Sequence, residues 1–219
     1  MSRFERQRLE MITRQLRARG INQPRVLAAM AAVPREHFVD RAFAHEAYAD
    51  QPLPIGAGQT ISQPYVVARM AELAEIHPDD RVLDVGVGSG YQAAVLSHLA
   101  GHVFGVEIRR ELAELAERRL AELGLERVAV RVGDGGYGWA EHAPYDAIVV
   151  AAAAEKPPIP LLAQLADGGR MVIPLGDPMS QELVRIVRRG DDFVRKGFGQ
   201  VRFVAFMGDY GERLAPGSN

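Results

Sequence analysis

Cysteine is absent from this chain of 219 residues. Disulfide bonds, thiolate ligands for metals and a cysteine nucleophile are therefore excluded. Lysine is scarce, since Lys156 and Lys196 are the two lysines among 26 basic residues, and this bias carries no functional conclusion. With 28 acidic residues the formal net charge is −2, so the chain lacks the basic surplus that is typical of nucleic-acid-binding proteins.

Long apolar segments are also missing. The longest of them, residues 147–154, is far shorter than the roughly 18 residues that a membrane-spanning helix needs. The first residues, 1–6, are charged and lack the apolar core of a secretory signal peptide. We therefore expect a cytoplasmic protein that binds neither membranes nor nucleic acid. Its length suits one domain with a sizeable core.

The middle of the chain alternates between short apolar segments and amphipathic ones. This alternation of strand-like and helix-like patterns predicts an α/β fold with a doubly wound, mostly parallel sheet. A central parallel strand is almost entirely apolar, and residues 146–152 form such a run after Asp146. The expected strands are 82–85, 103–106, 128–132, 146–152 and 171–173, and the expected helices are 91–100, 111–123 and 157–165.

Two helices are expected before the sheet. Residues 3–19 place Leu9, Ile12 and Leu16 on one face of an amphipathic helix. A second helix is expected between residues 24 and 34, because a proline stands at each limit. Together they predict a helical cap on the sheet.

The segment that follows the cap, residues 38–61, reads as an irregular loop. A loop of this length is uncommon inside a compact domain unless it serves a site. Ser62 then stands where a helix N-cap belongs, with Pro64 in the first turn. Capping and a role in the site are two compatible interpretations of Ser62.

The end of the chain departs from the β-α pattern. Residues 182–187 and 193–196 flank a polar turn with a glycine, which predicts an antiparallel hairpin. A further strand is expected at 201–206, and we expect the tail, 213–219, to be frayed.

Residues 82–91 are the most informative stretch, because an apolar strand runs into Gly86, Gly88 and Gly90 and then into a helix. Glycine adopts a positive φ readily and lets a ligand approach the backbone closely. A strand, a glycine loop and a helix in this order form a nucleotide-type binding corner. The alternative is a tight turn that binds nothing.

Three acidic residues follow three successive strands, namely Asp84, Glu107 and Asp134. The carboxyl ends of parallel strands share one edge of a sheet, so these carboxylates can line one crevice. We expect Glu107 to accept both ribose hydroxyls, Asp134 to accept from an adenine amino group, and Asp84 to meet a positive part of the ligand. An acid beside the glycines would repel a pyrophosphate, which favours S-adenosyl-L-methionine over a dinucleotide.

Several segments resemble the protein-L-isoaspartate (D-aspartate) O-methyltransferase family of Rossmann-like class I methyltransferases. The glycine motif alone is typical of the whole superfamily, whereas the segment that ends in Ser62-Gln63-Pro64 is specific to the family. The segments that carry the resemblance are 56–64, 82–91, 144–150, 165–176 and 202–204.

The resemblance implies a cofactor, S-adenosyl-L-methionine, and a set of site residues. Ser62 would belong to the catalytic loop, and Thr60, Ser62 and Val204 would border the substrate. The implied cofactor contacts are Asp84, Gly86, Gly88, Gly90, Glu107, Asp134 and Gly135. The chain departs from the family at Ala205, where proline is usual, and in the alanine run 151–154.

The implied reaction methylates the free α-carboxylate of L-isoaspartyl residues in damaged proteins. That carboxylate has a pKa of about 3.5–4 and is already ionised at neutral pH, so no general base is needed. Ser62 would orient it by a hydrogen bond. We expect no metal site, because Gly101 interrupts the one pair of nearby histidines, His98 and His102.

The resemblance also divides the chain. It predicts one methyltransferase domain, 1–219, in which residues 1–62 form the cap and catalytic loop, 63–176 the cofactor-binding core and 177–212 the C-terminal strands. A monomer is expected, with isoaspartyl proteins and peptides as partners. Two alternatives remain: a methyltransferase of the same fold that acts on RNA or a small molecule, and a non-catalytic adenosine-binding module.

Overall fold

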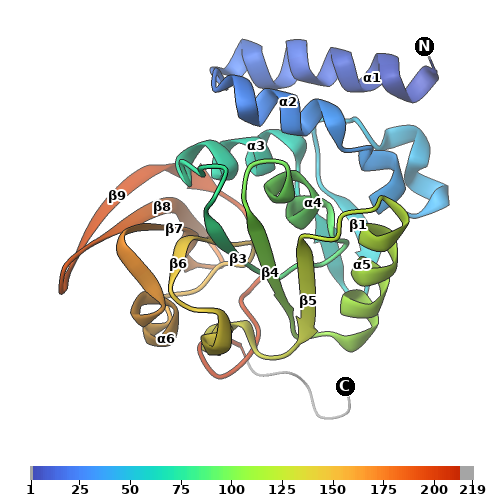
Figure 1. Cartoon of the computed structure of the whole chain (residues 1–219). Coiled ribbons are helices and arrows are strands. Elements are labelled where there is room, and N and C mark those ends of the chain that lie inside the picture. Colours follow the sequence, from blue (N-terminus) through green and yellow to red (C-terminus); the bar gives the residue numbers. More distant parts are fainter. Residues whose placement is uncertain (1, 213–219) are drawn as a thin grey trace.

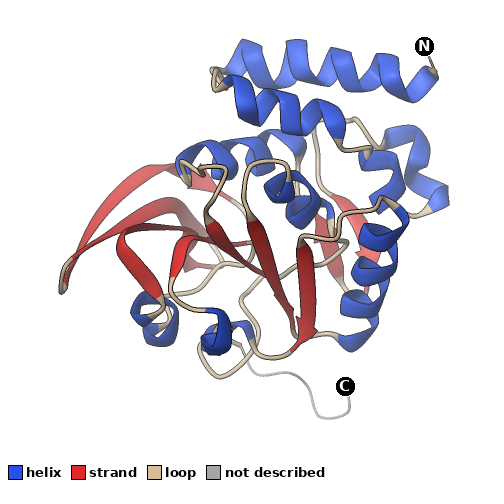
Figure 2. Cartoon of the chain, viewed as in Figure 1, coloured by secondary structure: helices blue, strands red, loops and turns tan. Residues whose placement is uncertain are grey.

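The computed structural model describes residues 2–212, and the tail that was expected to be frayed lies outside them. Its centre is a seven-stranded sheet of order β5-β4-β3-β6-β7-β8-β9 (Figures 1 and 2). The pairs from β5 to β7 are parallel, and β8 and β9 are antiparallel. The strands are β3 (Arg81–Val85), β4 (His102–Glu107), β5 (Val128–Val132), β6 (Tyr145–Val150), β7 (Leu165–Asp177), β8 (Ser180–Arg189) and β9 (Asp192–Val201). The predicted doubly wound, mostly parallel sheet is confirmed.

Helices cover both faces of the sheet, and α1 and α2 form a further layer on one of them (Figure 1). The first apolar cluster joins α1 through α5 to one face of the sheet, and the second joins α6 and the 206–210 segment to the other face. The helices are α1 (Arg3–Met11), α2 (Pro24–Ala32), α3 (Pro64–Leu73), α4 (Tyr91–Ser97), α5 (Arg110–Glu122) and α6 (Ile159–Ala163).

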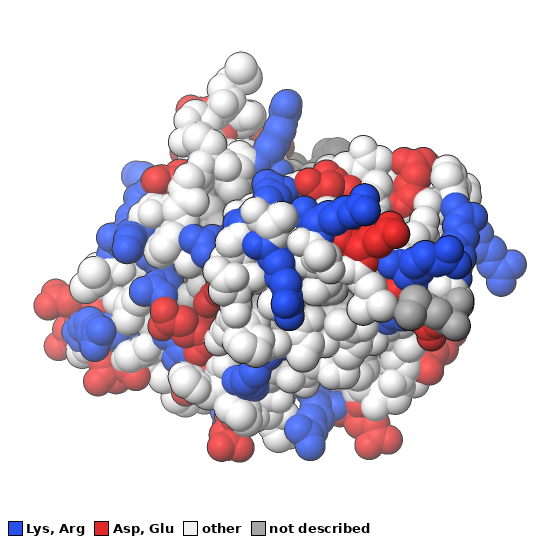
Figure 3. Space-filling view, turned by 90° about the horizontal axis from the view of Figure 1, so that it is seen from above, with Lys and Arg blue, Asp and Glu red and all other residues white. Residues whose placement is uncertain are grey.

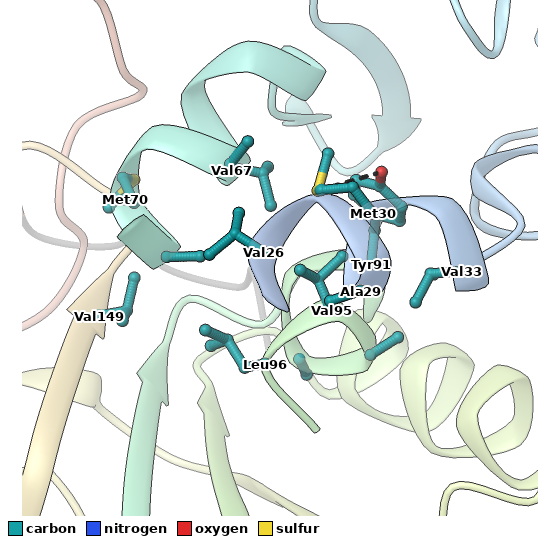
Figure 4. Packing of buried hydrophobic residues seen from close by; sticks show 14 of the residues in the cluster. Val26, Ala29, Met30, Val33, Val67, Met70, Tyr91, Val95, Leu96 and Val149 are labelled. Carbon is teal, nitrogen blue, oxygen red and sulfur yellow. Dashed lines mark hydrogen bonds between the residues drawn. The ribbon is translucent and has the colours of Figure 1, made fainter. Parts of the chain in front are cut away.

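The cap is held by apolar packing of α2 against α3 and α4 (Figure 4). Met30 of α2 is fully buried, and its sulfur lies 3.9 Å from the hydroxyl of Tyr91 in α4. Val26 is fully buried between Val67 of α3 and Leu96 of α4. Each such side chain stabilises the fold by about 1.5–3 kcal/mol, so the cap is part of the core.

The first helix is not uniform along its length. It continues from α1 into a π-helical segment, Ile12–Leu16, and a 3-10 turn, Arg17–Arg19. The buried stripe contains Met11 besides Ile12 and Leu16, whereas Leu9 is 49% exposed. The prediction that Leu9 lies on the buried face was therefore wrong, because the stripe that meets the rest of the protein passes through Met11 instead.

Residues 38–61 are not irregular throughout, as the sequence had suggested. They contain a 3-10 helix, Arg41–Glu46, and an antiparallel hairpin of β1 (Leu53–Gly56) and β2 (Gln59–Ile61). The hairpin turns through left-handed residues, including Ala57 with a φ of 51°. A turn of this kind matches the twist of paired strands, so the glycines that were interpreted as loop residues form a hairpin turn.

The C-terminal hairpin of β8 and β9 is confirmed, but the strand expected at 201–206 is not present. β9 ends at Val201, and the chain then leaves the sheet. Residues 153 and 205 form a single bridge there. The strand expected at 171–173 is part of the longer β7, within which the pairing with β6 shifts from Tyr145↔Leu165 to Ala147↔Arg170.

Candidate active site

A cleft of about 800 Å³, including the part open to solvent, lies at the carboxyl edge of the sheet. The chain passes from β3 outward to β4 and β5 and then returns to β6 on the other side of β3. The strand order reverses at that point, and ligands of open α/β sheets bind where it does. Loops after β3, β4, β5 and β6 all contribute to the cleft. Its volume lies in the range of small-molecule sites.

The glycine loop after β3 needs its glycines. Gly86, Gly88 and Gly90 have φ angles of 83°, 54° and 93°. A Cβ atom on Gly90 would lie 3.3 Å from that of Ala116 in α5, so the helix or the loop would have to shift by a few tenths of an ångström to accept a larger residue. Gly86 and Gly88 line the cleft. The bend therefore brings bare backbone to the ligand.

Glu107, at the end of β4, lines the cleft and is 5% exposed. Its Oε2 accepts a hydrogen bond of 2.8 Å from the Gly88 N–H, and its Oε1 accepts one of 2.9 Å from the Arg109 N–H. Burial raises the pKa of Glu107, and these backbone donors oppose the shift. A carboxylate fixed in this way retains lone pairs for two ligand hydroxyls, as a ribose requires.

Asp84 does not line the cleft, although it was expected to meet the ligand. It is fully buried behind Gln92, whose Nε2 donates to Asp84 Oδ1 at 2.7 Å. Asp84 Oδ2 has no hydrogen-bond partner. Burial raises the pKa of Asp84 to about 7, and the neighbouring Glu107 adds to the shift. Gln92 itself lines the cleft.

Asp134 and Gly135 are placed differently from each other. Gly135 lines the cleft, and a Cβ atom there would lie 2.5 Å from a methyl group of Val85. Asp134 is not among the lining residues. Its two oxygens accept hydrogen bonds of 2.8 Å, one from the Gly136 N–H and one from the Asp209 N–H. Asp134 therefore fastens the C-terminal segment beside the cleft.

Thr60, Ser62 and Val204 lie together on a wall of the cleft. The same three residues also line a neighbouring groove that is open to solvent. The N-cap of α3 is Gln63, and no side chain caps this helix. The prediction that Ser62 caps the helix was therefore wrong. The helix begins at Pro64, so the N-cap position falls on Gln63 and Ser62 lies one residue before it.

Arg35 supports the loop before Ser62. The sequence did not predict this role, because neither Arg35 nor its neighbours form a recognisable motif. The side chain is fully buried, although arginine is usually exposed. Its guanidinium donates to the carbonyl oxygen of Ser62 at 3.0 Å, to that of Gln51 at 3.3 Å and to that of Ala47. Burial lowers the pKa of Arg35 to about 10, so it keeps its charge at neutral pH.

The alanine run contributes backbone rather than side chains to the site. The Ala153 N–H donates to the Val204 carbonyl at 2.9 Å, and the Phe206 N–H donates to the Ala153 carbonyl at 2.8 Å. Ala151, Ala152 and Ala205 line the cleft. The small residues therefore hold the returning segment next to the strand end and leave the cleft open.

The chemistry of the cleft fits S-adenosyl-L-methionine. Glu107 offers acceptors to a ribose, and Gln92 Oε1 is a buried acceptor without a partner, as a donor-bearing ligand needs. No group of three acidic or histidine side chains suited to a metal occurs among the described residues. Every helix within residues 2–212 is too short or too polar to span a bilayer.

Comparisons with known proteins agree on one family. The family model described as protein-L-isoaspartate (D-aspartate) O-methyltransferase matches residues 6–211. A relative from Syntrophus aciditrophicus, named protein-L-isoaspartate O-methyltransferase, is 48% identical over 214 residues, which are 96% of this chain and 98% of the relative. One from Protochlamydia amoebophila with the same name is 52% identical over 203 residues, 92% of this chain and 97% of its own.

Solved structures show the same likeness. One that is named protein-L-isoaspartate O-methyltransferase has a TM-score of 0.86 at 29% identity, over 93% of this chain and 67% of the other. A Plasmodium falciparum structure in complex with S-adenosyl-L-homocysteine has a TM-score of 0.78 over 94% of this chain and 99% of the other. Its identity of 23% supports the shared fold alone.

Proposed function

The chain belongs to the protein-L-isoaspartate (D-aspartate) O-methyltransferase family, and from that membership we propose how its residues share the work. It is an S-adenosyl-L-methionine-dependent enzyme of protein repair that methylates L-isoaspartyl residues. The bound cofactor supplies a methyl group on a positively charged sulfur. The side chains of this protein hold and orient the two reactants and exclude water.

One observation carries the assignment of the reacting position. Thr60, Ser62 and Val204, together with Ala151, border both the cleft and the neighbouring groove. A cofactor in the cleft and a peptide in the groove would therefore meet at this shared border. Where the cleft and the groove share a border, the two reactants can be held side by side for a direct transfer, in which alignment supplies much of the rate.

Ser62 is the proposed catalytic residue. Its hydroxyl donates a hydrogen bond to one oxygen of the isoaspartyl α-carboxylate and leaves the other oxygen to attack the methyl carbon. The carboxylate is ionised at neutral pH, so no proton has to be removed. The absence of a capping bond at α3 supports this role, because the hydroxyl is not committed to the helix.

The cofactor end of the site divides between two elements. Glu107 is proposed to accept the ribose hydroxyls, because Gly88 and Arg109 fix its carboxylate at the edge of the cleft. Gly135 lines the cleft after β5, where we place the adenine. Asp134 acts indirectly. Its carboxylate accepts a hydrogen bond from the Asp209 N–H and so holds the C-terminal segment beside that end of the cleft.

Methyl transfer to an isoaspartyl peptide, compared with its normal aspartyl twin, tests the proposal. Ser62→Ala should lower turnover about 10- to 100-fold, because a hydrogen bond to a charged group is worth about 1.5–3 kcal/mol. The affinity for S-adenosyl-L-homocysteine and the thermal stability should stay unchanged. Ser180→Ala is the matched control, because Ser180 is exposed and lies at the start of β8. An equal loss of turnover and cofactor affinity would show that Ser62 is a structural residue.

We further propose that the chain works as a cytoplasmic monomer, in one domain, without nucleic acid or membranes. Acidic and basic residues are interspersed on the face seen from above, which suits neither a nucleic acid nor an anionic lipid surface (Figure 3). Light scattering after size exclusion tests the monomer, and a pull-down with transfer RNA tests for nucleic acid. A stable dimer or a complex with RNA would overturn the respective proposal.

A further inference from the structure

The strands of the β1–β2 hairpin stop pairing just before the proposed catalytic residue. Leu53 faces Ile61 in the last pair of this antiparallel ladder. The next facing residues are therefore Pro52 and Ser62. Proline has no N–H to donate, so the carbonyl oxygen of Ser62 cannot obtain a hydrogen bond from Pro52 and needs a donor from elsewhere.

Side chains join the two segments where the backbone ladder ends. Arg35 donates to the carbonyl oxygens of Ser62 at 3.0 Å and of Gln51 at 3.3 Å. Gln63 Nε2 donates to Asp50 Oδ1 at 2.7 Å and to the Asp50 carbonyl oxygen at 3.1 Å. Ser62 and Gln63 are therefore each tied to the segment 50–51, one through Arg35 and the other through Asp50.

The Asp50 carboxylate has two partners, one for each oxygen. Besides the bond from Gln63 to Oδ1, its Oδ2 accepts from Arg19 Nη1 at 3.0 Å. The Arg19 guanidinium in turn lies over the ring of Tyr65 in α3, 3.6 Å from the ring centroid. Arg19, Gln63 and Tyr65 line the groove that neighbours the cleft, whereas Asp50 is not among its lining residues. An effect of Asp50 on the reaction would therefore act through its partners.

We propose that Asp50 is a positioning residue for Ser62. Its carboxylate holds the Gln63 side chain, and this bond fixes the start of α3 and with it the place of Ser62 at the shared border of the cleft and the groove. The inference rests on the proposed function for the role of Ser62 and adds a residue that sets its position.

The exposure of the cluster decides which property should respond. The Arg19 and Asp50 side chains are 42% and 40% exposed. An exposed ion pair contributes little to stability. A displacement of a reacting group by about 1 Å, in contrast, can lower a rate about 100-fold. The loss of the Asp50 carboxylate should therefore affect turnover much more than folding.

Steady-state methyl transfer to an isoaspartyl peptide tests the role. Asp50→Ala should lower kcat about 5- to 20-fold, a partial loss because the bond from Gln63 to the backbone carbonyl of residue 50 remains. The affinity for S-adenosyl-L-homocysteine should change less than about twofold, and the melting temperature by less than about 4 °C. Asp50→Asn keeps an oxygen that can accept from Gln63, so its kcat should stay within about threefold of the unsubstituted protein.

Two further variants make the test specific. Glu46→Ala is the matched control, because Gln51 Nε2 donates to Glu46 Oε2 at 2.8 Å in a similar exposed bond that does not include Ser62 or Gln63. It should leave kcat unchanged. Gln63→Leu removes the partner of Asp50. Asp50→Ala added to it should lower kcat less than about twofold further, because the shared bond is already lost.

A label at residue 62 reports its position without the reaction. Cysteine is absent from the chain, so Ser62→Cys introduces a single thiol that can carry a trifluoromethyl group. Fluorine NMR should show one resonance for this protein, and the same resonance when Glu46→Ala is added. Asp50→Ala should displace that resonance or add a second one.

The outcomes separate this inference from the proposed function. An unchanged kcat in Asp50→Ala, a matching loss of cofactor affinity or an equal loss in Glu46→Ala would overturn the role of Asp50. If the unsubstituted protein transfers no methyl group to the peptide, the proposed function fails. The fluorine resonance then still decides the position of residue 62, and an unchanged resonance in Asp50→Ala would overturn the inference.

Discussion

Asp84 should make the stability of this protein fall as pH rises. The carboxyl group is fully buried, and burial raises its pKa from 3.8 to about 7, with a smaller contribution from Glu107. Between these two values the folded protein binds a proton at Asp84 that the unfolded chain does not. The free energy of unfolding therefore decreases with increasing pH across that window.

The magnitude follows from the two pKa values. A difference of about three units corresponds to roughly 4 kcal/mol in total at 1.36 kcal/mol per unit. About 2.5 kcal/mol of this should be lost between about pH 5 and about pH 8, since unfolded aspartate is already ionised at the lower limit. This is a large fraction of the 5–15 kcal/mol that a domain usually has.

Urea unfolding at about pH 5 and about pH 8 measures the effect, with Asp84→Asn as the comparison. The variant has no proton to lose at this position, and every other group titrates as before. Its stability relative to the unsubstituted protein should increase by about 2.5 kcal/mol between the two pH values. If the two proteins lose stability in parallel, within about 0.5 kcal/mol, then Asp84 is ionised in the folded protein and the reasoning is wrong.

Four further substitutions test other parts of the site and the fold. Arg35→Met removes the donor from three buried carbonyls and should cost about 3–5 kcal/mol of stability, measured by urea unfolding; an unchanged midpoint would contradict its clamping role. Glu107→Ala should weaken S-adenosyl-L-homocysteine and methylthioadenosine equally in calorimetry, because both contain the ribose, and unchanged affinities would exclude that role. Gly135→Ala brings a methyl group against Val85 and should cost about 1–3 kcal/mol by the same unfolding assay, whereas neutrality would mean that β3 yields easily. Leu9→Gln should change stability by less than about 0.5 kcal/mol, and a larger loss would place Leu9 in the core.

The sheet could be predicted from the sequence because its signals are local. Each strand from β3 to β6 is a short, mostly apolar segment. The glycines at 86, 88 and 90 have a meaning that does not depend on the rest of the fold, since positive φ angles favour glycine. The position of Glu107 could be predicted from the same pattern, because this residue ends a strand at the edge of the sheet where ligands bind.

The errors arise where distant contacts decide the outcome. Ser62 stands one residue before the N-cap, Gln63, and its carbonyl oxygen accepts a hydrogen bond from Arg35, which is distant in the sequence. Leu9 is exposed whereas Met11 is fully buried in the main apolar cluster, and the sequence of one helix does not show which of its faces meets the rest of the protein. The sequence did not predict a site role for Gln92 or Arg35. Arg35 bonds carbonyl oxygens that are distant in the sequence, and the role of Gln92 depends on its burial beside the cleft.

The position of Val204, late in the sequence but next to Ser62 in space, has a consequence for folding during translation. Ser62 and Val204 form one wall, but they leave the ribosome at nearly opposite stages. The glycine loop and Glu107 emerge between them, so the parts that hold the cofactor can fold before the wall is closed. Domains form their long-range contacts late, after the local ones. We therefore expect a nascent chain to acquire cofactor binding first and the ability to modify another protein only when its last segment has docked.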